Sequence, residues 1–408
     1  MIIGFDASRA FISNRSGTEN YSYQLLINLA RLDQTNNYHI FLRPPTTLES
    51  AKATFSWPSN FKLILLPYPR FWTQFGLAKQ TFIDPLDVLF IPAHTVPLIR
   101  KPGLKTVMTV HDLGAEFLPQ AHQVKQRLYL KMMTDFQLKS ATHLIAVSKS
   151  TKKDIIQKVG VPEKNISVIY EGYNQELFKA KPDRDNTILK QFELEKNNYF
   201  LFVGTIQPRK NLVRVIEAYA IFLGVTGASV RGDAEESSQA STAYSPKANE
   251  DAPETPKRQD PSHIVPQLVL VGSKGWLSDE IYELPKKLGI QNKVKLLGYV
   301  PDEKLPVLYS NALAFVFPSL YEGFGLPILE AFASSCPVLT SNTSSLPEVA
   351  GKAALLVNPE SVEEIAHGME KIMDQKLRTK LIQEGKKQLQ KFSWEKCARE
   401  TLKILENA

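Results

Sequence analysis

Cysteine is scarce in this sequence, and its scarcity excludes several kinds of protein. Cys336 and Cys397 are the two cysteines among 408 residues, too few and too far apart for a disulfide framework. Such a composition fits a reducing compartment, so we expect a cytoplasmic protein. Cysteine and histidine also form no cluster with the spacing of metal ligands, and we therefore expect no metal site.

Long apolar runs are missing as well. No stretch reaches the roughly 18 apolar residues that a membrane-spanning helix needs. The first six residues end in an acid, Asp6, and Arg9 follows soon after. This pattern is typical of a buried strand and a polar turn, and not of a signal peptide with its long apolar segment.

Acidic residues are under-represented in the first half of the chain. Residues 1–180 hold 21 Lys and Arg against 13 Asp and Glu, whereas the formal net charge of the whole chain is +7. Two interpretations stay open: a surface that contacts phosphorylated acceptors or anionic lipid at the inner face of the plasma membrane, and a basic face that is simply solvated. No nucleic-acid-binding motif accompanies the charge, so we expect no nucleic-acid partner.

What the sequence does contain is a regular alternation of short β-branched runs and longer amphipathic stretches. This alternation is typical of βαβ units and parallel sheets. The expected strands are residues 2–6, 38–43, 62–66, 88–91, 105–111, 143–148 and 166–170, then 199–203, 267–271, 294–297, 314–317, 337–340 and 354–357. The expected helices are residues 18–32, 122–139, 149–159, 212–222, 279–288, 302–310, 326–333, 362–373 and 377–391.

The length and the restart of this pattern predict two domains. A chain of 408 residues is too long for one ordinary core, and two doubly wound sheets fit better than one long sheet. We expect a first domain at residues 1–175, a second at 176–391 and a closing helix within 392–408. Residues 224–264 are rich in Ser, Ala, Glu, Pro and Lys without periodicity. They predict a disordered insertion, either inert or partner-binding.

The segment 316–330 predicts an anion site. A buried strand ends at Phe317, and a loop with Gly323 and Gly325 leads into a helix that starts near Pro327. Proline suits a first helical turn, and glycines let the backbone approach a ligand closely. The helix start directs free N–H groups at that ligand. Open α/β sheets bind their ligands at this carboxyl end of the strands.

Two acidic residues flank these glycines. Glu322 lies in the loop and Glu330 on the helix, where both would repel an anion. Carboxylates are good acceptors for vicinal hydroxyls, so one acid for each of two sugar rings explains the pair. The alternative is a solvated loop acid and a helix acid that interacts with the helix dipole.

A basic pair occupies a second strand–turn–helix segment, residues 202–211. Arg209 offers a planar fork for phosphate oxygens, and Lys210 adds a compact charge. Two cations at a helix start oppose the helix dipole, and a bound diphosphate would explain their placement. A basic pair that is merely exposed is the alternative.

Three features together resemble the retaining glycosyltransferases of family 4: residues 204–211, the Glu-x7-Glu pair of Glu322 and Glu330, and residues 345–349. The resemblance covers nearly the whole chain outside the insertion. It implies the α/β fold called GT-B, in which two Rossmann-like doubly wound domains face each other across a cleft. The closing helix of such proteins commonly packs back on the first domain, so Trp394 is expected to be a packing anchor.

The resemblance also implies roles for residues of the second domain. Arg209 and Lys210 would bind the donor diphosphate and stabilise the charge that develops on it. Glu322 would contact the hydroxyls of the donor hexose, and Glu330 those of the nucleotide ribose. The remaining donor contacts would be the backbone N–H groups of Phe324, Gly325 and Leu326, with the base near Val300.

In the first domain, the resemblance places His111 near the reacting carbon of the donor sugar. A histidine there can donate a hydrogen bond or stabilise charge, although a strand-end histidine with satisfied hydrogen bonds is the alternative. Asp112 is a further candidate. Gly17 and Thr18 belong to a loop that would lie against the donor phosphate and the acceptor, but relatives often have two adjacent glycines there. His94 would line the acceptor site or be structural.

The implied reaction moves a hexose from a nucleotide diphosphate-sugar to a hydroxyl of a glycan or lipid-linked acceptor, with retention of configuration. Likeness to bacterial polysaccharide mannosyltransferases favours GDP-mannose as donor and cell-envelope polysaccharide as product. No cofactor is required if the basic pair and the helix start neutralise the leaving diphosphate. Two alternatives stay open: a nucleotide-sugar epimerase of the same fold, and a non-catalytic sugar-nucleotide-binding protein. A nicotinamide dehydrogenase is disfavoured because no G-x-G-x-x-G follows the first strand.

Overall fold

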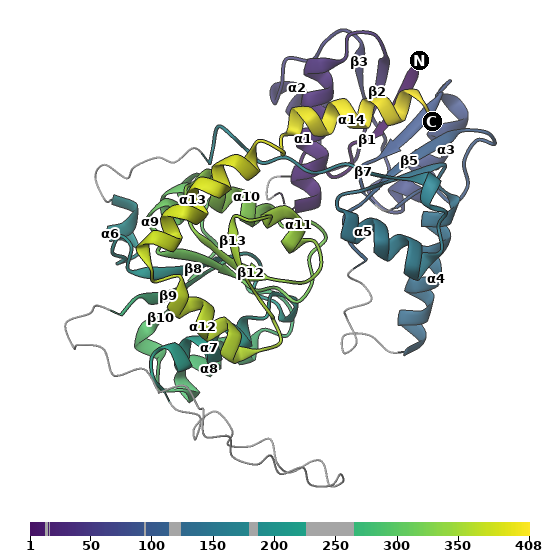
Figure 1. The fold of residues 1–408 in the computed structure, drawn as a ribbon. Coiled ribbons are helices and arrows are strands. Elements are labelled where there is room, and N and C mark those ends of the chain that lie inside the picture. The colour runs from purple at the N-terminus through teal and green to yellow at the C-terminus, as the bar shows by residue number, and fades with distance from the viewer. Residues whose placement is uncertain (13–14, 16, 94, 114–123, 179–186, 226–264) are drawn as a thin grey trace.

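The first of two parallel sheets lies in the purple-to-blue half of Figure 1, which shows a computed structural model of the chain. The structure describes all residues except 13–14, 16, 94, 114–123, 179–186 and 226–264. The first sheet has the order β3-β2-β1-β4-β5-β6-β7. Its strands are β1 (Ile2–Asp6), β2 (Asn37–Leu42), β3 (Phe61–Leu65), β4 (Val88–Ile91), β5 (Lys105–Val110), β6 (His143–Ala146) and β7 (Ile166–Val168).

The second parallel sheet has the order β10-β9-β8-β11-β12-β13. Its strands are β8 (Tyr199–Val203), β9 (Gln267–Val271), β10 (Val294–Gly298), β11 (Ala314–Phe317), β12 (Val338–Ser341) and β13 (Ala354–Val357). In each sheet the order reverses at one strand, because β1 pairs with both β2 and β4 and β8 pairs with both β9 and β11. Such a reversal is where open α/β sheets bind ligands.

Helices make most of the connections between the strands. The α-helices are α1 (Gly17–Leu32), α2 (Leu48–Ala53), α3 (Ala78–Ile83), α4 (Val124–Ser140), α5 (Lys149–Asp154), α6 (Thr187–Gln191), α7 (Leu212–Phe222), α8 (Asp279–Lys287), α9 (Leu305–Asn311), α10 (Leu326–Ala333), α11 (Leu346–Ala350), α12 (Val362–Lys371), α13 (Gln375–Leu389) and α14 (Trp394–Glu406). The π-helical turns are η1 (Trp72–Leu77) and η3 (Ile155–Val159), and the 3-10 turns are η4 (Glu163–Asn165), η5 (Pro208–Lys210), η6 (Gln291–Lys293) and η7 (Asp302–Lys304). Of the helices that the structure describes, none combines the length and the apolar character needed to cross a bilayer.

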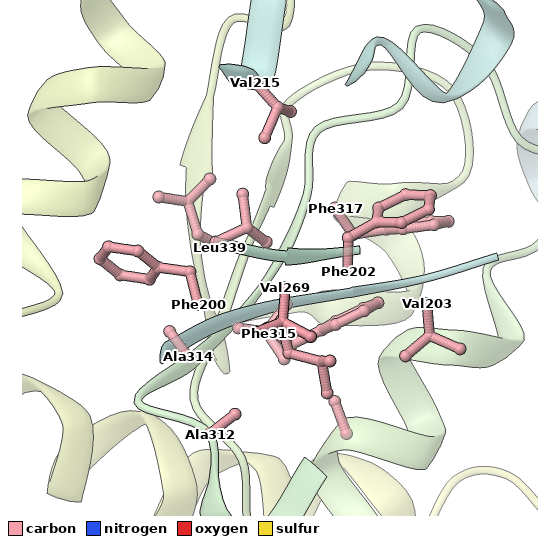
Figure 2. Close-up of a cluster of buried hydrophobic side chains, with 14 of the residues drawn as sticks. Phe200, Phe202, Val203, Val215, Val269, Ala312, Ala314, Phe315, Phe317 and Leu339 are labelled. Carbon is pink, nitrogen blue, oxygen red and sulfur yellow. The ribbon is translucent and has the colours of Figure 1, made fainter. Parts of the chain in front are cut away.

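The strands of the second sheet are almost entirely apolar and buried. Every residue of β8 and of β11 is buried, as expected for a parallel sheet that is covered on both faces. Figure 2 shows the aromatic side chains at its centre, where Phe202 and Phe317 stack with ring centroids 5.8 Å apart. Burying one such ring stabilises the fold by about 1.5–3 kcal/mol. The loops that follow β8 and β11 are therefore anchored to well-packed strands.

The chain crosses between the two sheets twice. The first crossing follows β7, and the second leads into α14, the yellow helix that packs against α1 in Figure 1. Trp394 at the start of α14 is buried in the core of the first sheet, with its ring centroid 5.8 Å from that of Tyr21. A Cβ on Gly172 would lie 2.1 Å from the backbone nitrogen of Trp394. The two crossings thus contact each other.

Several element boundaries differ from the expected ones for local reasons. The strand expected at 143–148 ends at Ala146, because the Ser148 side chain turns to cap α5 and accepts from the Thr151 N–H. The helix expected at 149–159 is α-helical to Asp154, and its remaining residues form the π-helical turn η3. The helices α2 and α3 were not expected, since six residues each are too few for a clear periodic pattern. Residues 226–264 of the expected insertion lie outside the described residues.

Candidate active site

Three charged side chains meet beyond the carboxyl ends of β8 and β11. Arg209 and Lys210 end the 3-10 turn that follows β8, and Glu322 lies in the loop that follows β11. Lys210 Nζ is 2.7 Å from Glu322 Oε1, and Arg209 Nη1 is 3.0 Å from Glu322 Oε2. Each cation binds a different carboxylate oxygen, so these three residues form one charge cluster.

The loops that carry the charge cluster are bound to each other through the backbone. The Leu320 N–H donates to the Arg209 carbonyl at 3.0 Å. Asn211 has a left-handed backbone at φ 62°, and its buried side-chain amide donates to the Pro318 carbonyl at 3.0 Å. Asparagine tolerates that conformation better than most residues. The residue after the basic pair thus sets where α7 begins and ties the β8 loop to the β11 loop.

Burial strengthens the electrostatics of the charge cluster. Lys210 is 8% exposed, and its burial lowers the pKa of the ammonium group, while the charge of Glu322 opposes that effect. Its Nζ also lies 4.7 Å from the centroid of the Phe317 ring, which favours the charged form. Charges act more strongly in such a water-poor site than at the surface. The cluster is suited to bind an anion that replaces part of the interaction with Glu322.

The start of α10 adds unpaired donors beside the charge cluster. Gly325 precedes this helix at φ 118°, and Pro327 occupies its first turn. Within the described part of the chain, the N–H groups of Phe324, Gly325 and Leu326 have no hydrogen-bond acceptor. The positive end of the helix dipole reinforces these donors. This loop therefore has the chemistry of a phosphate site.

Glu330, further along α10, has a different partner. The Tyr309 hydroxyl donates to Glu330 Oε2 at 3.1 Å. Burial of the carboxyl group raises the pKa of Glu330 from 4.5 to about 7, the Tyr309 hydrogen bond lowers it in part, and the charge of Asp302 adds to the rise. The group titrates near neutral pH, so a ligand that bonds to the ionised form would be bound more weakly in acid.

Both ring nitrogens of His111 have partners inside the protein. Nδ1 is 3.0 Å from Glu171 Oε1, and Nε2 is 2.9 Å from the Pro92 carbonyl oxygen. Since both partners are acceptors, the two bonds form together when each nitrogen carries a proton. Burial opposes that charged form, but Glu171 and the Pro92 carbonyl outweigh burial and raise the pKa of His111. The ring is thus held by the first domain, as in the alternative of a satisfied strand-end histidine.

The loop after β11 also contacts the first domain directly. The Ser148 and Thr151 hydroxyl oxygens lie 2.7 and 3.1 Å from the Gly323 carbonyl oxygen. A Cβ on Gly323 would lie 1.7 Å from the carbonyl oxygen of His111, so a larger residue would force the two domains apart. These contacts bring the site residues of both domains together.

Other contacts of the site were not expected from the sequence. These contacts involve buried polar residues, namely Glu171, Ser148 and Thr151. Each residue is of a common type, and its partner in the site lies far away in the sequence. The signal available for Glu171 was an acid beside Gly172 in the crossing segment. A single acid in a linker does not reveal that it meets His111, 60 positions earlier.

The remaining predicted residues lie apart from the charge cluster or outside the described residues. Gly17 and Thr18 begin α1, and no hydrogen bond or ion pair among the described residues joins them to the charge cluster. Val300 is buried just after β10. His94 lies outside the described residues. Among the residues that are described, no group of three His, Cys, Asp or Glu side chains is placed to hold a metal ion.

Comparisons with known proteins show the family of this chain. Residues 15–177 match the model of Glycosyltransferase Family 4, and residues 251–388 match that of Glycosyl transferases group 1. The O-antigen chain mannosyltransferase B of Escherichia coli is 31% identical over 299 residues, which cover 73% of this chain and 69% of that protein. The chain belongs to glycosyltransferase family 4.

A second relative and two solved structures are also similar to this glycosyltransferase, and the solved structures concern the fold. The O-antigen chain mannosyltransferase RfbU of Salmonella typhimurium is 28% identical over 65% of this chain and 59% of its own length. Among solved structures, sucrose-phosphate synthase from Thermosynechococcus elongatus has a TM-score of 0.70 at 20% identity, covering 100% of this chain and 98% of its own. WaaG, a glycosyltransferase of lipopolysaccharide biosynthesis, has a TM-score of 0.66 at 17% identity, with both chains fully covered. The fold is GT-B, with two Rossmann-like domains, as expected.

Proposed function

We propose that this glycosyltransferase moves a hexose from a nucleotide diphosphate-sugar to a hydroxyl of a glycan or lipid-linked acceptor, with retention of configuration. The observation that carries the proposal is the charge cluster of Arg209, Lys210 and Glu322 beside the N–H groups at the start of α10, which have no acceptor in the described part of the chain. Two cations and a helix start suit a diphosphate. The carboxylate between them suits sugar hydroxyls.

In the proposed reaction, the donor diphosphate takes over the two cations that are paired with Glu322. Glu322 is then available to accept hydrogen bonds from the hexose hydroxyls. The bond between the anomeric carbon and the phosphate oxygen breaks with its electron pair on the phosphate, where Arg209, Lys210 and the α10 N–H groups stabilise the charge. The acceptor oxygen bonds to the same face of that carbon, and its proton passes to the leaving phosphate oxygen.

Mannose from GDP-mannose is the proposed donor group, and cell-envelope polysaccharide is the proposed product. Support comes from the relatives, since the proteins of Escherichia coli and Salmonella typhimurium are both named O-antigen chain mannosyltransferases. A nucleoside diphosphate donor gains support from the Anabaena protein HepE, which was solved in complex with UDP and glucose and has a TM-score of 0.68 to this chain. We propose Glu330 as the acceptor for the ribose hydroxyls of that donor, with the base near Val300.

The test is to measure thermal unfolding of the full chain with GDP-mannose, GDP-glucose, UDP-glucose and UDP-galactose, and GDP or UDP release with an acceptor. A donor at about 100 times its Kd should stabilise the fold by about 2.7 kcal/mol, and we expect this with GDP-mannose. Release should persist in excess chelator, because the cations do the work of a metal. Stabilisation without release would indicate a non-catalytic binding protein, and conversion of the donor sugar would indicate an epimerase. A strict need for Mn²⁺ or Mg²⁺ would contradict the metal-free scheme.

We propose in addition that the first domain contacts an anionic bilayer at the inner face of the plasma membrane. Six large apolar residues in or directly before η1, in α3 and in the loop after β4 are 37–73% exposed. This apolar surface consists of Phe71, Phe75, Phe82, Ile83, Leu98 and Ile99. Its parts are bound together, because the Gln74 side chain bonds to the Leu98 N–H at 2.9 Å and Thr81 Oγ1 accepts from the Lys101 N–H at 3.1 Å.

The charges around the apolar surface match a negatively charged membrane. Arg70, Lys79 and Lys101 are exposed at its edges. The neighbouring acid Asp84 is paired with His39 at 2.8 Å. Exposed aromatic side chains surrounded by cations are typical of a surface that inserts into lipid head groups. The loop after β4 begins at Pro92, whose carbonyl bonds to His111, so a lipid-linked acceptor held at this surface would lie near the site.

A further inference from the structure

Two consecutive residues of the first crossing bind opposite domains. The Tyr170 hydroxyl donates to Glu348 Oε1 of the second domain at 2.6 Å. The next residue, Glu171, accepts from His111 of the first domain at 3.0 Å. A connection that was only a tether would not need a buried polar contact on one side and a partly buried one on the other. This crossing therefore has a fixed place relative to each domain.

Glu348 binds the first domain at a second point. Its two oxygens accept from the Lys149 N–H at 3.0 Å each, and Oε2 accepts from the Ser150 N–H at 3.4 Å. These N–H groups form the first turn of α5, while Glu348 belongs to α11 of the second domain. Hydrogen bonds to an ionised carboxylate are stronger than bonds between neutral groups. One side chain thus joins the second domain to the crossing and to α5.

Helix α5 also contacts the loop between β11 and α10. The Tyr321 hydroxyl donates to Asp154 Oδ2 at the end of α5 at 2.7 Å. Ser148 and Thr151, at the start of α5, bond to the Gly323 carbonyl. Tyr321 and Gly323 flank Glu322, a member of the charge cluster. The position of α5 therefore determines how the loop between β11 and α10 packs against the first domain.

We propose that Glu348 is a positioning residue that, together with Tyr170, holds the two domains in the arrangement in which the active site is complete. Glu348 is not among the residues predicted to bind the donor. It acts through α5 and the loop around Glu322. In the closed arrangement, His111 and Asp112 of the first domain lie against Gly323 and Arg209 of the second. Closure of that kind excludes water and so favours transfer over hydrolysis of the donor. The kinetic part of this inference rests on the proposed transfer reaction, and the structural part does not.

The test compares Glu348→Gln with Glu364→Gln as a matched control. Glu364 lies in the same domain, and its carboxylate accepts the Asn358 N–H at 2.9 Å within that domain. Both variants lose one charge and keep the size of the side chain. Tyr170→Phe removes only the hydroxyl that binds Glu348, so it tests the same contact with a smaller change to the fold.

Without donor, Glu348→Gln should speed hydrogen exchange at the Lys149 and Ser150 amides and increase the radius of gyration measured by X-ray scattering. A shift of about tenfold in the equilibrium between closed and open forms is expected from weakening charge-assisted bonds. Tyr170→Phe should increase the radius in the same direction, and Glu364→Gln should match the unchanged protein. An unchanged radius in both Glu348→Gln and Tyr170→Phe would overturn the proposal.

With donor and acceptor, Glu348→Gln should raise the ratio of donor hydrolysis to transfer, by about tenfold for a tenfold change in closure. A residue that only stabilised the fold would lower both rates in proportion to the folded fraction and leave their ratio unchanged, and that result would also contradict the proposal. If the unchanged protein transferred no sugar, the proposed function would fail while the exchange and scattering results still decided the role of Glu348.

Discussion

The charge cluster shows how a single residue can serve two states of the protein. Lys210 is buried, and a buried cation without a partner is costly. Glu322 is that partner, at 2.7 Å. A diphosphate brings its own negative charge and can replace Glu322 without leaving the ammonium group unpaired. The pair is therefore consistent both with a stable fold and with the proposed donor site.

Lys210→Ala should lower transfer by about a hundredfold or more, since one donor to a developing charge is commonly worth that much. Lys287→Ala is the control, because Lys287 is an exposed lysine of the same domain that pairs with Glu283 on the surface. Release of the nucleoside diphosphate at saturating donor is the measurement, with circular dichroism to show that both variants are folded. Full activity of a folded Lys210→Ala would remove this residue from the site.

Glu330 should make both stability and donor binding depend on pH. Its pKa is about 7 in the folded protein against 4.5 for the ordinary group, so the native state binds the additional proton between those values. Stability should therefore fall as pH rises from about 4.5 to about 7, by roughly 1–2 kcal/mol once solvent screening is allowed for. Glu330→Gln should flatten this part of the curve of unfolding free energy against pH.

The proposed ribose contact gives the opposite dependence for the donor. Ribose hydroxyls bond best to the ionised carboxylate, so the KM for the donor should rise as pH falls below about 7. Glu330→Gln should have a raised KM that changes little over this range. A donor KM with the same pH profile in the variant and in the unchanged protein would separate Glu330 from the donor.

At the scale of elements, the loop between β11 and α10 meets two requirements at once. It presents N–H groups at Phe324, Gly325 and Leu326 that have no acceptor among the described residues, and it contacts the first domain at Gly323. The contact at Gly323 leaves no room for a side chain, although Gly323 has no positive φ. The glycine is thus required by the neighbouring domain and not by its own backbone.

Gly323→Ala should reduce transfer strongly while the second domain remains folded. The added methyl group would lie 1.7 Å from the His111 carbonyl oxygen, so the domains must separate locally. Thermal unfolding of the second domain should change little, because Gly323 has no positive φ and alanine adds no strain of that kind. Kinetics and X-ray scattering of the variant check this, and an active variant with unchanged dimensions would show that the close contact is absent in solution.

The elements themselves were largely predictable from the sequence. The strands Ile2–Asp6, Tyr199–Val203 and Ala314–Phe317 lie where the apolar runs place them, because a buried parallel strand needs an almost continuous run. Short helices such as α2 and α3 were not, since six residues carry little periodicity. The strand expected at 143–148 was too long at its end, because the sequence does not show that Ser148 caps the next helix instead of continuing the strand.

At the scale of the whole molecule, the basic first half and its apolar surface favour one face toward a bilayer. The variant Phe71→Ser/Phe75→Ser should bind vesicles of phosphatidylcholine with about a third phosphatidylglycerol at least about tenfold more weakly, since each phenylalanine contributes about 1.5–3 kcal/mol when buried. The control Leu277→Ser/Met373→Ser changes exposed apolar residues of the second domain. Sedimentation with vesicles measures the binding.

Added salt provides a second check of this surface. Attraction by Arg70, Lys79 and Lys101 is screened within about 8–10 Å at physiological ionic strength, so binding should weaken as salt rises. Equal binding of both double variants would contradict the assignment of the apolar surface. Binding of the unchanged protein to vesicles of phosphatidylcholine alone, at equal strength, would contradict the role of the charges.

The sequence by itself determined the two parallel sheets, the fold family and the residue types of the donor site, because strands, helix starts and glycine loops are local patterns. Arg209, Lys210 and Glu322 could be named from such patterns. Only the tertiary structure decided that Glu322 holds both cations, that His111 is held by Glu171, and that Glu348 joins the domains. Those contacts link residues 60 to 199 positions apart, and nothing in a local pattern specifies which distant partner a charged side chain will meet once the two domains pack together.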